Sequence, residues 1–122
     1  MPYEQHVLDH YSKPYHKGPF PDSRYSNQLG SARSEVCGDL VQIEASVEDG
    51  ILTEIWWKGE GCCFSQAAAS MLVEFARGKT VDKMISFSAE ELFDLFQAEI
   101  PIARCSCVLV SLEALQNLLE DC

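Results

Sequence analysis

Alternating apolar and polar residues in the first half of the chain predict a small antiparallel sheet. From Ser31 onward, and most clearly over 41–47, apolar side chains recur at every second position, as in a strand with one buried face. Asp49-Gly50 is a strong two-residue hairpin signal, so a return strand is expected over Ile51–Lys58. A first strand before Cys37 would complete a three-stranded meander. The residues expected to share one face of each hairpin strand are Val41, Ile43, Ala45 and Val47, and Ile51, Thr53, Ile55 and Trp57.

The segment that precedes this sheet has a different character. Tyr3, Val7 and Tyr11 recur at helical spacing and predict a short opening helix. Prolines and glycines then punctuate residues 12–30, which are expected to form an irregular arm over the surface.

Three helices are predicted after the sheet. The first runs over 65–77, where Gly78 ends it. A capping-box variant at 88–91 opens the second helix, which Pro101 breaks. The third covers Arg104–Leu119. The predicted fold class is α+β, a three-stranded antiparallel meander packed on one face by several C-terminal helices, in a single domain over residues 1–122. The inward positions expected on the last helix are Leu112, Leu115, Leu118 and Leu119.

Composition and charge narrow the classes of function. The net charge of −10, from 19 acidic and 9 basic residues, repels phosphate backbones and anionic lipid. Neither nucleic acid nor a membrane is therefore an expected partner. The first residues lack the features of a secretory signal, and no apolar run approaches the roughly 20 residues that span a bilayer. A cytoplasmic location is expected, in which the six cysteines bind metal or carry redox chemistry rather than forming disulfides.

Three cysteines and one aspartate lie near the ends of predicted elements, and all of them except Cys107 stand beside glycines. Cys37 and Asp39 flank a glycine that allows a sharp turn where a strand ends. Cys62 follows 59–61 and precedes a helix, and Cys107 lies in the first turn of the last helix, so both thiols are near a helix N-terminus that stabilises a thiolate. Soft thiolates with one hard oxygen suit tetrahedral Zn²⁺ or iron in a cluster with one labile corner. A dispersed set that includes a weaker carboxylate ligand favours release of what it binds.

These motifs closely resemble those of the iron–sulfur scaffold family IscU/NifU/SufU. The matching segments are Cys37-Gly38-Asp39, Gly59-Glu60-Gly61-Cys62 with the small residues at 65–71, and Arg104-Cys105-Ser106-Cys107. Residues 7–14 are also similar to the opening helix of that family and its following turn. The resemblance extends over essentially the whole chain and implies a SufE/NifU-like fold.

The resemblance implies a scaffold on which iron and sulfur from a cysteine desulfurase become a [2Fe–2S] cluster, which then passes to apo-proteins. Carried over position by position, the implied ligands of the cluster or metal ion are Cys37, Asp39, Cys62 and Cys107. Cys107 and Cys37 are the candidate acceptors of persulfide sulfur. The family role is that of a scaffold rather than an enzyme, and sulfurtransferase activity stays open.

Three departures separate this chain from the family subtypes. Ser106 stands where the IscU type has histidine. Residues 100–103 replace the proline–proline–valine–lysine segment that IscU-type proteins offer to a dedicated Hsp70, which argues against that chaperone as a partner. Arg104 resembles SufU, in which Zn²⁺ fills the site and persulfide comes from a SufS-type desulfurase, but the short run after Phe96 leaves no room for the SufU insertion. The alternatives are a zinc-dependent sulfurtransferase that activates its desulfurase and a purely structural zinc domain used for protein contacts.

Several other side chains near these motifs are candidates for a supporting role, and for each of them ordinary packing is the alternative. Cys63 and Cys105 are candidates for spare sulfur acceptors or substitute ligands, whereas Cys122 carries little functional weight at the end of the chain. Arg104 is a candidate for supporting Asp39 or the persulfide-bearing thiol electrostatically.

The histidines and tryptophans fit no ligand motif. His6, His10 and His16 are assigned surface or packing roles. Trp56 and Trp57 occupy opposite faces of one strand, so one is expected in the core. The other is expected to be exposed or covered by the N-terminal arm, and in that position it could anchor a partner.

Overall fold

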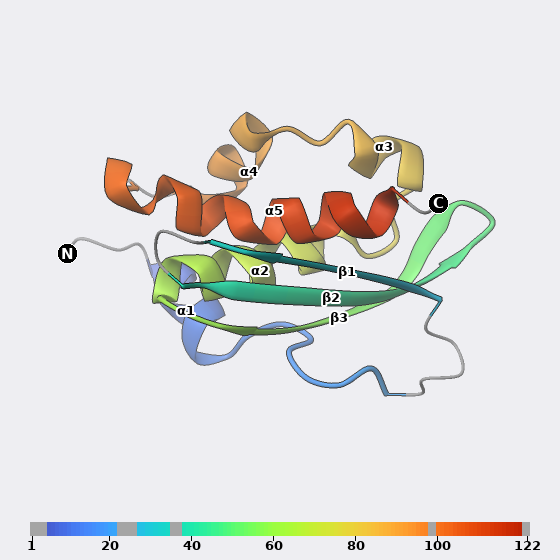
Figure 1. Ribbon diagram of the computed structural model, residues 1–122, viewed down its shortest axis with the longest axis horizontal. Helices are drawn as coiled ribbons and strands as arrows, with labels where there is room; N and C mark the ends of the chain where they lie inside the picture. The colour runs from blue at the N-terminus through green and yellow to red at the C-terminus, as the bar shows by residue number, and fades with distance from the viewer. Residues whose placement is uncertain (1–4, 22–26, 35–37, 98–99, 121–122) are drawn as a thin grey trace.

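The predicted sheet is present in the computed structural model of the protein, which describes residues 5–21, 27–34, 38–97 and 100–120 (Figure 1). Three antiparallel strands lie in the order β1-β2-β3, so consecutive strands are neighbours. The α+β fold with a meander and several helices is therefore confirmed. The strands are β1 (Gln28–Arg33), β2 (Leu40–Glu48) and β3 (Ile51–Glu60).

Near the hairpin turn the strand faces depart from simple alternation. A register shift between Ser46 and Val47 leaves Thr53 as an extra residue of β3. Because such a bulge reverses which residues point inward, Leu52 is buried whereas Ile51 and Thr53 are exposed. The prediction was therefore wrong for the inward face at these two positions. It is confirmed for the other two, Ile55 and Trp57.

Two local signals are confirmed in their detailed geometry. Asp49 and Gly50 have φ values of 53° and 76°, the left-handed pair that a type I′ hairpin turn requires. Ser88 accepts a hydrogen bond from the N–H of Glu91, and the Glu91 side chain accepts one from the N–H of Ser88. This reciprocal capping box fixes the start of the fourth helix.

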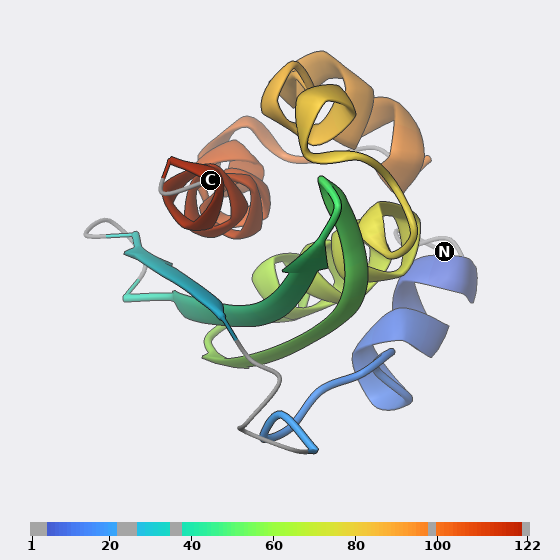
Figure 2. The same ribbon diagram turned by 90° about the vertical axis from the view of Figure 1, so that its right-hand side faces the viewer.

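The helices cover one face of the sheet. Figure 2 shows the strands curving around the second and last helices, and both contact the sheet. The short helix after residue 80 was not predicted, because five residues carry little periodic signal, although Thr80 caps it by accepting a hydrogen bond from the N–H of Lys83. The helices are α1 (Gln5–Ser12), α2 (Cys63–Ala76), α3 (Val81–Ile85), α4 (Ala89–Phe96), the 3₁₀ turn η2 (Ile102–Arg104) and α5 (Cys105–Leu119).

Helix α5, together with the turn that precedes it, is a long apolar segment. Residues Ile102–Leu119 have the length and mean hydropathy, 1.3, of a membrane-crossing helix by composition alone. Half of this window is buried inside the protein, and α5 contacts β1, β2 and α2. Its apolar surface therefore serves the core. The inward positions predicted for it are confirmed as buried at Leu112, Leu115, Leu118 and Leu119.

The boundary between arm and sheet differs from the prediction at Gly30. This residue was expected to end the arm, but it lies within β1 and against α5. A Cβ atom at Gly30 would overlap the carbonyl oxygen of Ala114 and the backbone nitrogen of Leu118. Glycine is therefore required here because the strand and the helix backbone approach closely, rather than for turn formation.

The N-terminal arm lies along the free side of β3. The N–H of Gly18 donates to the Trp57 carbonyl at 2.8 Å, and the Trp57 N–H donates to the His16 carbonyl at 3.0 Å. Trp57 is buried in the core, whereas Trp56 stacks on the His16 ring at 4.3 Å between centroids. The arm thus covers Trp56, which is one of the two positions expected for it.

Candidate metal centre

Asp39, Cys62 and Cys107 come from three separate segments and meet at one end of the sheet. Asp39 directly precedes β2, Cys62 directly precedes α2, and Cys107 lies in the first turn of α5. One ligand atom from each residue lies within 4.8 Å of the others. Two sulfurs bound to one tetrahedral zinc ion are about 3.8 Å apart, since each Zn–S bond is about 2.3 Å. The three groups are therefore close enough to share one ion.

Cys37, the fourth ligand implied by the resemblance, lies outside the described residues. The described residues on either side of it are joined by hydrogen bonds. The Gly38 N–H donates to the Ser34 carbonyl at 2.8 Å, and the Ser34 N–H donates to the Asp39 carbonyl at 2.8 Å. Gly38 has a φ of 74°, which favours glycine at the turn that precedes Asp39.

The Asp39 carboxylate is fixed by the backbone of the neighbouring segment. It is 1% exposed, and one oxygen accepts a hydrogen bond from the Cys62 N–H at 2.9 Å. The other oxygen lies 3.8 Å from the Cys62 Sγ. The carboxylate therefore keeps one oxygen beside the thiol while the other anchors the peptide that carries it.

Gly61 is required by this arrangement. A Cβ atom at Gly61 would overlap one Asp39 carboxylate oxygen, and its φ of 142° is one that side chains rarely adopt. The glycine before Cys62 therefore makes room for the buried carboxylate.

Cys62 and Cys107 sit in the positive field of helix N-termini, as expected. Cys62 is the N-cap residue of α2, and its side chain makes no capping hydrogen bond. Unpaired N–H groups and the helix dipole favour an anionic group at such positions. Cys62 is partly exposed, whereas Cys107 is fully buried.

Cys63 and Cys105 are the partly exposed thiols beside this group. Burial and the neighbouring Cys62 raise the pKa of the Cys63 thiol above its ordinary value, and the positive charge of Arg104 opposes that rise. The Cys105 Sγ lies 3.7 Å from the Pro101 carbonyl oxygen. Arg104 is exposed on η2 and acts electrostatically on Cys63, a target that the sequence did not suggest. Cys122 lies outside the described residues.

Three polar residues behind the centre were missed in the sequence. Lys17 donates to the Gln66 side-chain oxygen at 3.1 Å, the Gln66 amide nitrogen donates to Ser65 Oγ at 3.2 Å, and Ser65 Oγ donates to the Cys62 carbonyl at 3.0 Å. The only sequence signal was the pair Ser65-Gln66 in an otherwise alanine-rich, buried helix. Its partner on the arm is 49 residues away and could not be inferred from spacing.

Histidines line a different region of the surface. His10 and His16 border a cleft of about 570 Å³ beside α1 and the arm. His10 Nδ1 lies 2.6 Å from Ser70 Oγ, and His16 Nδ1 lies 2.9 Å from the Ile55 carbonyl oxygen. These contacts are those of packed surface histidines. The side chain of His6 lies outside the described part of the structure.

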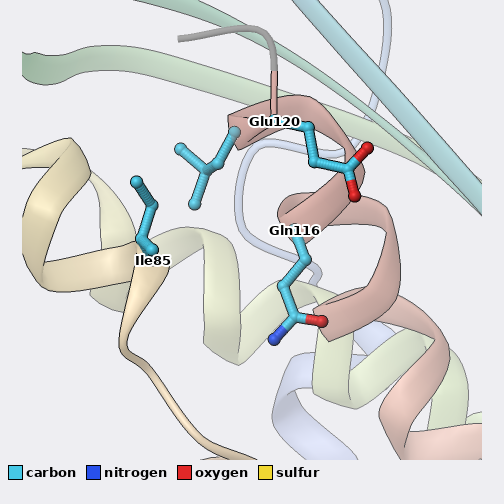
Figure 3. Close-up of a pocket in the computed structure, with 4 residues that line it drawn as sticks. Ile85, Gln116 and Glu120 are labelled. Atoms are coloured by element: carbon cyan, nitrogen blue, oxygen red, sulfur yellow. The ribbon is translucent and has the colours of Figure 1, made fainter.

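An open groove of about 430 Å³ lies at the opposite end of α5 (Figure 3). Among the described residues, its lining offers one carboxylate and no thiol or imidazole, which gives it little metal-binding character. The lining residues are Ile85, Gln116, Leu119 and Glu120.

The chain is similar in sequence to known iron–sulfur cluster assembly scaffold proteins. Over 122 residues the chain is 25% identical to the iron–sulfur cluster assembly scaffold protein IscU of Escherichia coli K12, covering 99% of this chain and 94% of that protein. It is 27% identical over 119 residues to IscU 1 of Archaeoglobus fulgidus, covering 98% of this chain and 75% of that protein.

Solved structures share the fold. A SufU protein of Fervidobacterium islandicum AW-1, described as a scaffold for the SUF system, superposes with a TM-score of 0.77 at 18% identity and covers 96% of both chains. The N-terminal part of a NifU-like protein from Brucella abortus gives 0.77 at 16% identity, covering 98% of this chain and 92% of that one. The family model described as the NifU-like N terminal domain matches residues 2–121, and the chain therefore belongs to the NifU-like N-terminal domain family.

Proposed function

We propose that the protein is an iron–sulfur cluster assembly scaffold that holds its cargo on Cys37, Asp39, Cys62 and Cys107. The observation that carries this proposal is the convergence of Asp39, Cys62 and Cys107 within 4.8 Å in a member of the NifU-like family. Thiolates are the ligands of iron–sulfur clusters, and a carboxylate oxygen is a weaker, exchangeable donor. The donor set therefore suits iron that is bound and later released.

Sulfur enters by exchange with a cysteine desulfurase. A thiolate of the scaffold, on Cys107 or Cys37, attacks the outer sulfur of the desulfurase persulfide. The new S–S bond forms as the old one breaks, and the desulfurase cysteine leaves as a thiolate. Reduction of that sulfur to sulfide then takes two electrons from an external reductant. Because Cys107 is fully buried, its use as acceptor requires local opening at the centre.

The partners follow from this chemistry. The proposal assigns a cysteine desulfurase as sulfur donor and apo iron–sulfur proteins as acceptors, with residues 1–122 acting as one domain. Free thiols and an exchangeable cluster require reducing conditions, so the proposed location is the cytoplasm.

Anaerobic reconstitution with Fe²⁺, sulfide and a thiol tests the proposal. Wild-type protein is expected to acquire the visible absorption of a [2Fe–2S] cluster and to pass it to an apo-ferredoxin. Cys62→Ser should fail to hold the cluster. Cys105→Ser, which removes a nearby thiol outside the converging group, should behave as wild type. A wild-type protein that stays colourless, or a Cys62→Ser variant that assembles normally, would contradict the proposal.

A second candidate function is zinc-dependent sulfur transfer that activates a SufS-type desulfurase. The position of Arg104 favours it, because the charge of this residue acts on the Cys63 thiol beside the centre. Turnover of a SufS-type desulfurase with zinc-loaded protein discriminates the two. Stimulation that Arg104→Ala abolishes, in a protein that builds no cluster, would favour the transferase. No stimulation and no cluster would leave a structural zinc domain.

A further inference from the structure

A continuous chain of hydrogen bonds joins the N-terminal arm to the peptide of Cys62. It begins at the Lys17 ammonium, passes through the Gln66 amide and the Ser65 hydroxyl, and ends on the Cys62 carbonyl, with donor–acceptor distances of 3.1, 3.2 and 3.0 Å. Gln66 and Ser65 are 3% and 0% exposed, so two links of the chain are buried behind the metal centre.

The direction of this chain is fixed by its first member. An ammonium group can only donate, so the oxygen of the Gln66 amide must face Lys17 and its NH₂ must face Ser65. Ser65 Oγ then accepts from Gln66 and gives its own proton to the Cys62 carbonyl. All bonds point the same way, from the positive charge toward Cys62, so each link polarises the next.

Both sides of the Cys62 residue are therefore held by specific partners. Its N–H donates to the Asp39 carboxylate, and its carbonyl accepts from Ser65 and from the Gln66 N–H at 3.2 Å. With both peptide groups fixed, the Cα–Cβ bond that carries the thiol has a defined direction. The Asp39 contact belongs to the centre itself, whereas the Ser65 contact on the carbonyl is connected through Gln66 to Lys17 of the arm.

We infer that Lys17, Gln66 and Ser65 are positioning residues for Cys62, and that through them the seating of the N-terminal arm is coupled to metal affinity at the centre. The inference rests on the proposed function in so far as Cys62 is a ligand. Lys17 is well placed for this role. Its ammonium lies 5.1 Å from the centroid of the Trp57 ring, and the next residue, Gly18, bonds the Trp57 carbonyl. Arm, β3 and Cys62 thus form one connected unit.

Zinc affinity, measured by competition with a chromophoric chelator, tests the inference. Lys17→Met, Gln66→Met and Ser65→Ala should each weaken Zn²⁺ binding by about tenfold, since groups that orient a metal ligand typically contribute this much. Lys17→Arg keeps a donor cation and should restore most of the affinity. Because the residues act in series, the double variant Lys17→Met/Ser65→Ala should also lose about tenfold, not the hundredfold expected of independent sites.

Two matched controls separate positioning from general stability. Ser111 is fully buried and donates to the carbonyl three residues earlier, as Ser65 does, but it is on α5. Lys13 is on the same arm and is exposed. Ser111→Ala and Lys13→Met should keep wild-type zinc affinity. The absorption of bound Co²⁺, which reports thiolate ligation, should change in the Lys17 and Ser65 variants and not in the controls.

Several outcomes would overturn the inference. Unchanged affinity and Co²⁺ spectrum in Lys17→Met would do so, as would an additive double variant or controls that weaken binding equally. If Ser65→Ala does not fold, Lys17→Met still tests the coupling, because it alters only the exposed end of the hydrogen-bond chain. Wild-type protein that binds Zn²⁺ with the predicted variant pattern but builds no cluster would refute the proposed function and leave this inference standing. Wild-type protein that binds neither Zn²⁺ nor iron would refute both the proposed function and this inference.

Discussion

The two ends of α5 lie at opposite ends of the sheet and are built in different ways (Figure 1). At its N-terminal end, Cys107 meets Asp39 and Cys62 in a group of ligand atoms that lie within 4.8 Å of one another. At its C-terminal end, α5 borders an open groove with Ile85, a residue that is more than half exposed. The first end gathers donors from three segments, and the second end is a surface between two helices.

Two glycines show the same difference between the metal centre and the far end of the sheet. Gly61 at the metal centre leaves space that the Asp39 carboxylate fills, whereas a Cβ at Gly50 in the distant hairpin would meet nothing within 4 Å. Gly50 is needed only for its left-handed φ of 76°. Gly61 is thus required by close packing against a buried carboxylate, whereas Gly50 is required only by the conformation of its turn.

The largest expected effect is the loss of a thiol at the centre. Cys107→Ser should weaken Zn²⁺ binding by roughly a hundredfold or more, because a serine hydroxyl does not ionise to replace a thiolate ligand near neutral pH. Glu120→Gln in the groove should leave the affinity unchanged. Chelator competition measures the zinc affinity of both variants. Equal losses of affinity in the two variants would contradict the assignment of metal binding to the N-terminal end of α5.

The two glycines provide the next test. Gly61→Ala forces a methyl group onto the Asp39 carboxylate, so it should lower the free energy of unfolding by about 2–3 kcal/mol and weaken zinc binding by more than about tenfold. Gly50→Ala should cost only about 1 kcal/mol, from its φ alone, and keep wild-type zinc affinity. Urea unfolding combined with zinc titration checks this. Similar zinc affinities in the two variants would mean that the close approach at Gly61 has no role in the centre.

A smaller change is expected when the weak ligand is removed. Asp39→Ala should prolong the lifetime of a reconstituted cluster several-fold, because the exchangeable oxygen donor no longer admits solvent or an acceptor. The decay of visible absorption in the presence of an apo-acceptor gives the lifetime. Glu60→Ala, which removes an exposed carboxylate at the same end of the sheet, serves as the control. An unchanged or shorter lifetime in Asp39→Ala would argue against a releasing role for Asp39.

The smallest expected effect concerns Cys63. Burial raises the pKa of this thiol, so near pH 8 a smaller fraction is thiolate than in an unperturbed cysteine, and alkylation should be slower. Arg104 lowers the same pKa, so Arg104→Gln should move the pH profile of alkylation further upward. Mass spectrometry of metal-free protein alkylated between about pH 7 and 10 follows the reaction. A profile that moves downward in Arg104→Gln would show that the arginine acts on a different group.

Local signals in the sequence were sufficient for most of the fold. The Asp49-Gly50 turn and the capping box at Ser88 depend on neighbouring residues only, and both are present. The extra residue at Thr53 was not predictable, because a bulge is defined by pairing across two strands. The role of Gly30 was missed for the same reason, since it depends on how closely α5 approaches β1.

The candidate site was predictable to the extent that its chemistry is local. The cysteine motifs and Asp39 were recognisable as candidate ligands from the sequence. Three of the four proposed ligands lie together in the described residues. The hydrogen bond from Lys17 to Gln66 could not be predicted, because lysine and glutamine are common surface residues and only the folded arm brings them together. Supporting residues of a site are thus harder to infer than its ligands.

X-ray absorption at the metal edge of zinc-loaded protein tests most directly whether these residues form one centre. We expect a mixed shell with sulfur at about 2.3 Å and one oxygen at about 2.0–2.2 Å, losing one sulfur in Cys62→Ser or in Cys107→Ser. A shell of oxygen and nitrogen only, or a sulfur shell that neither substitution alters, would contradict a shared centre.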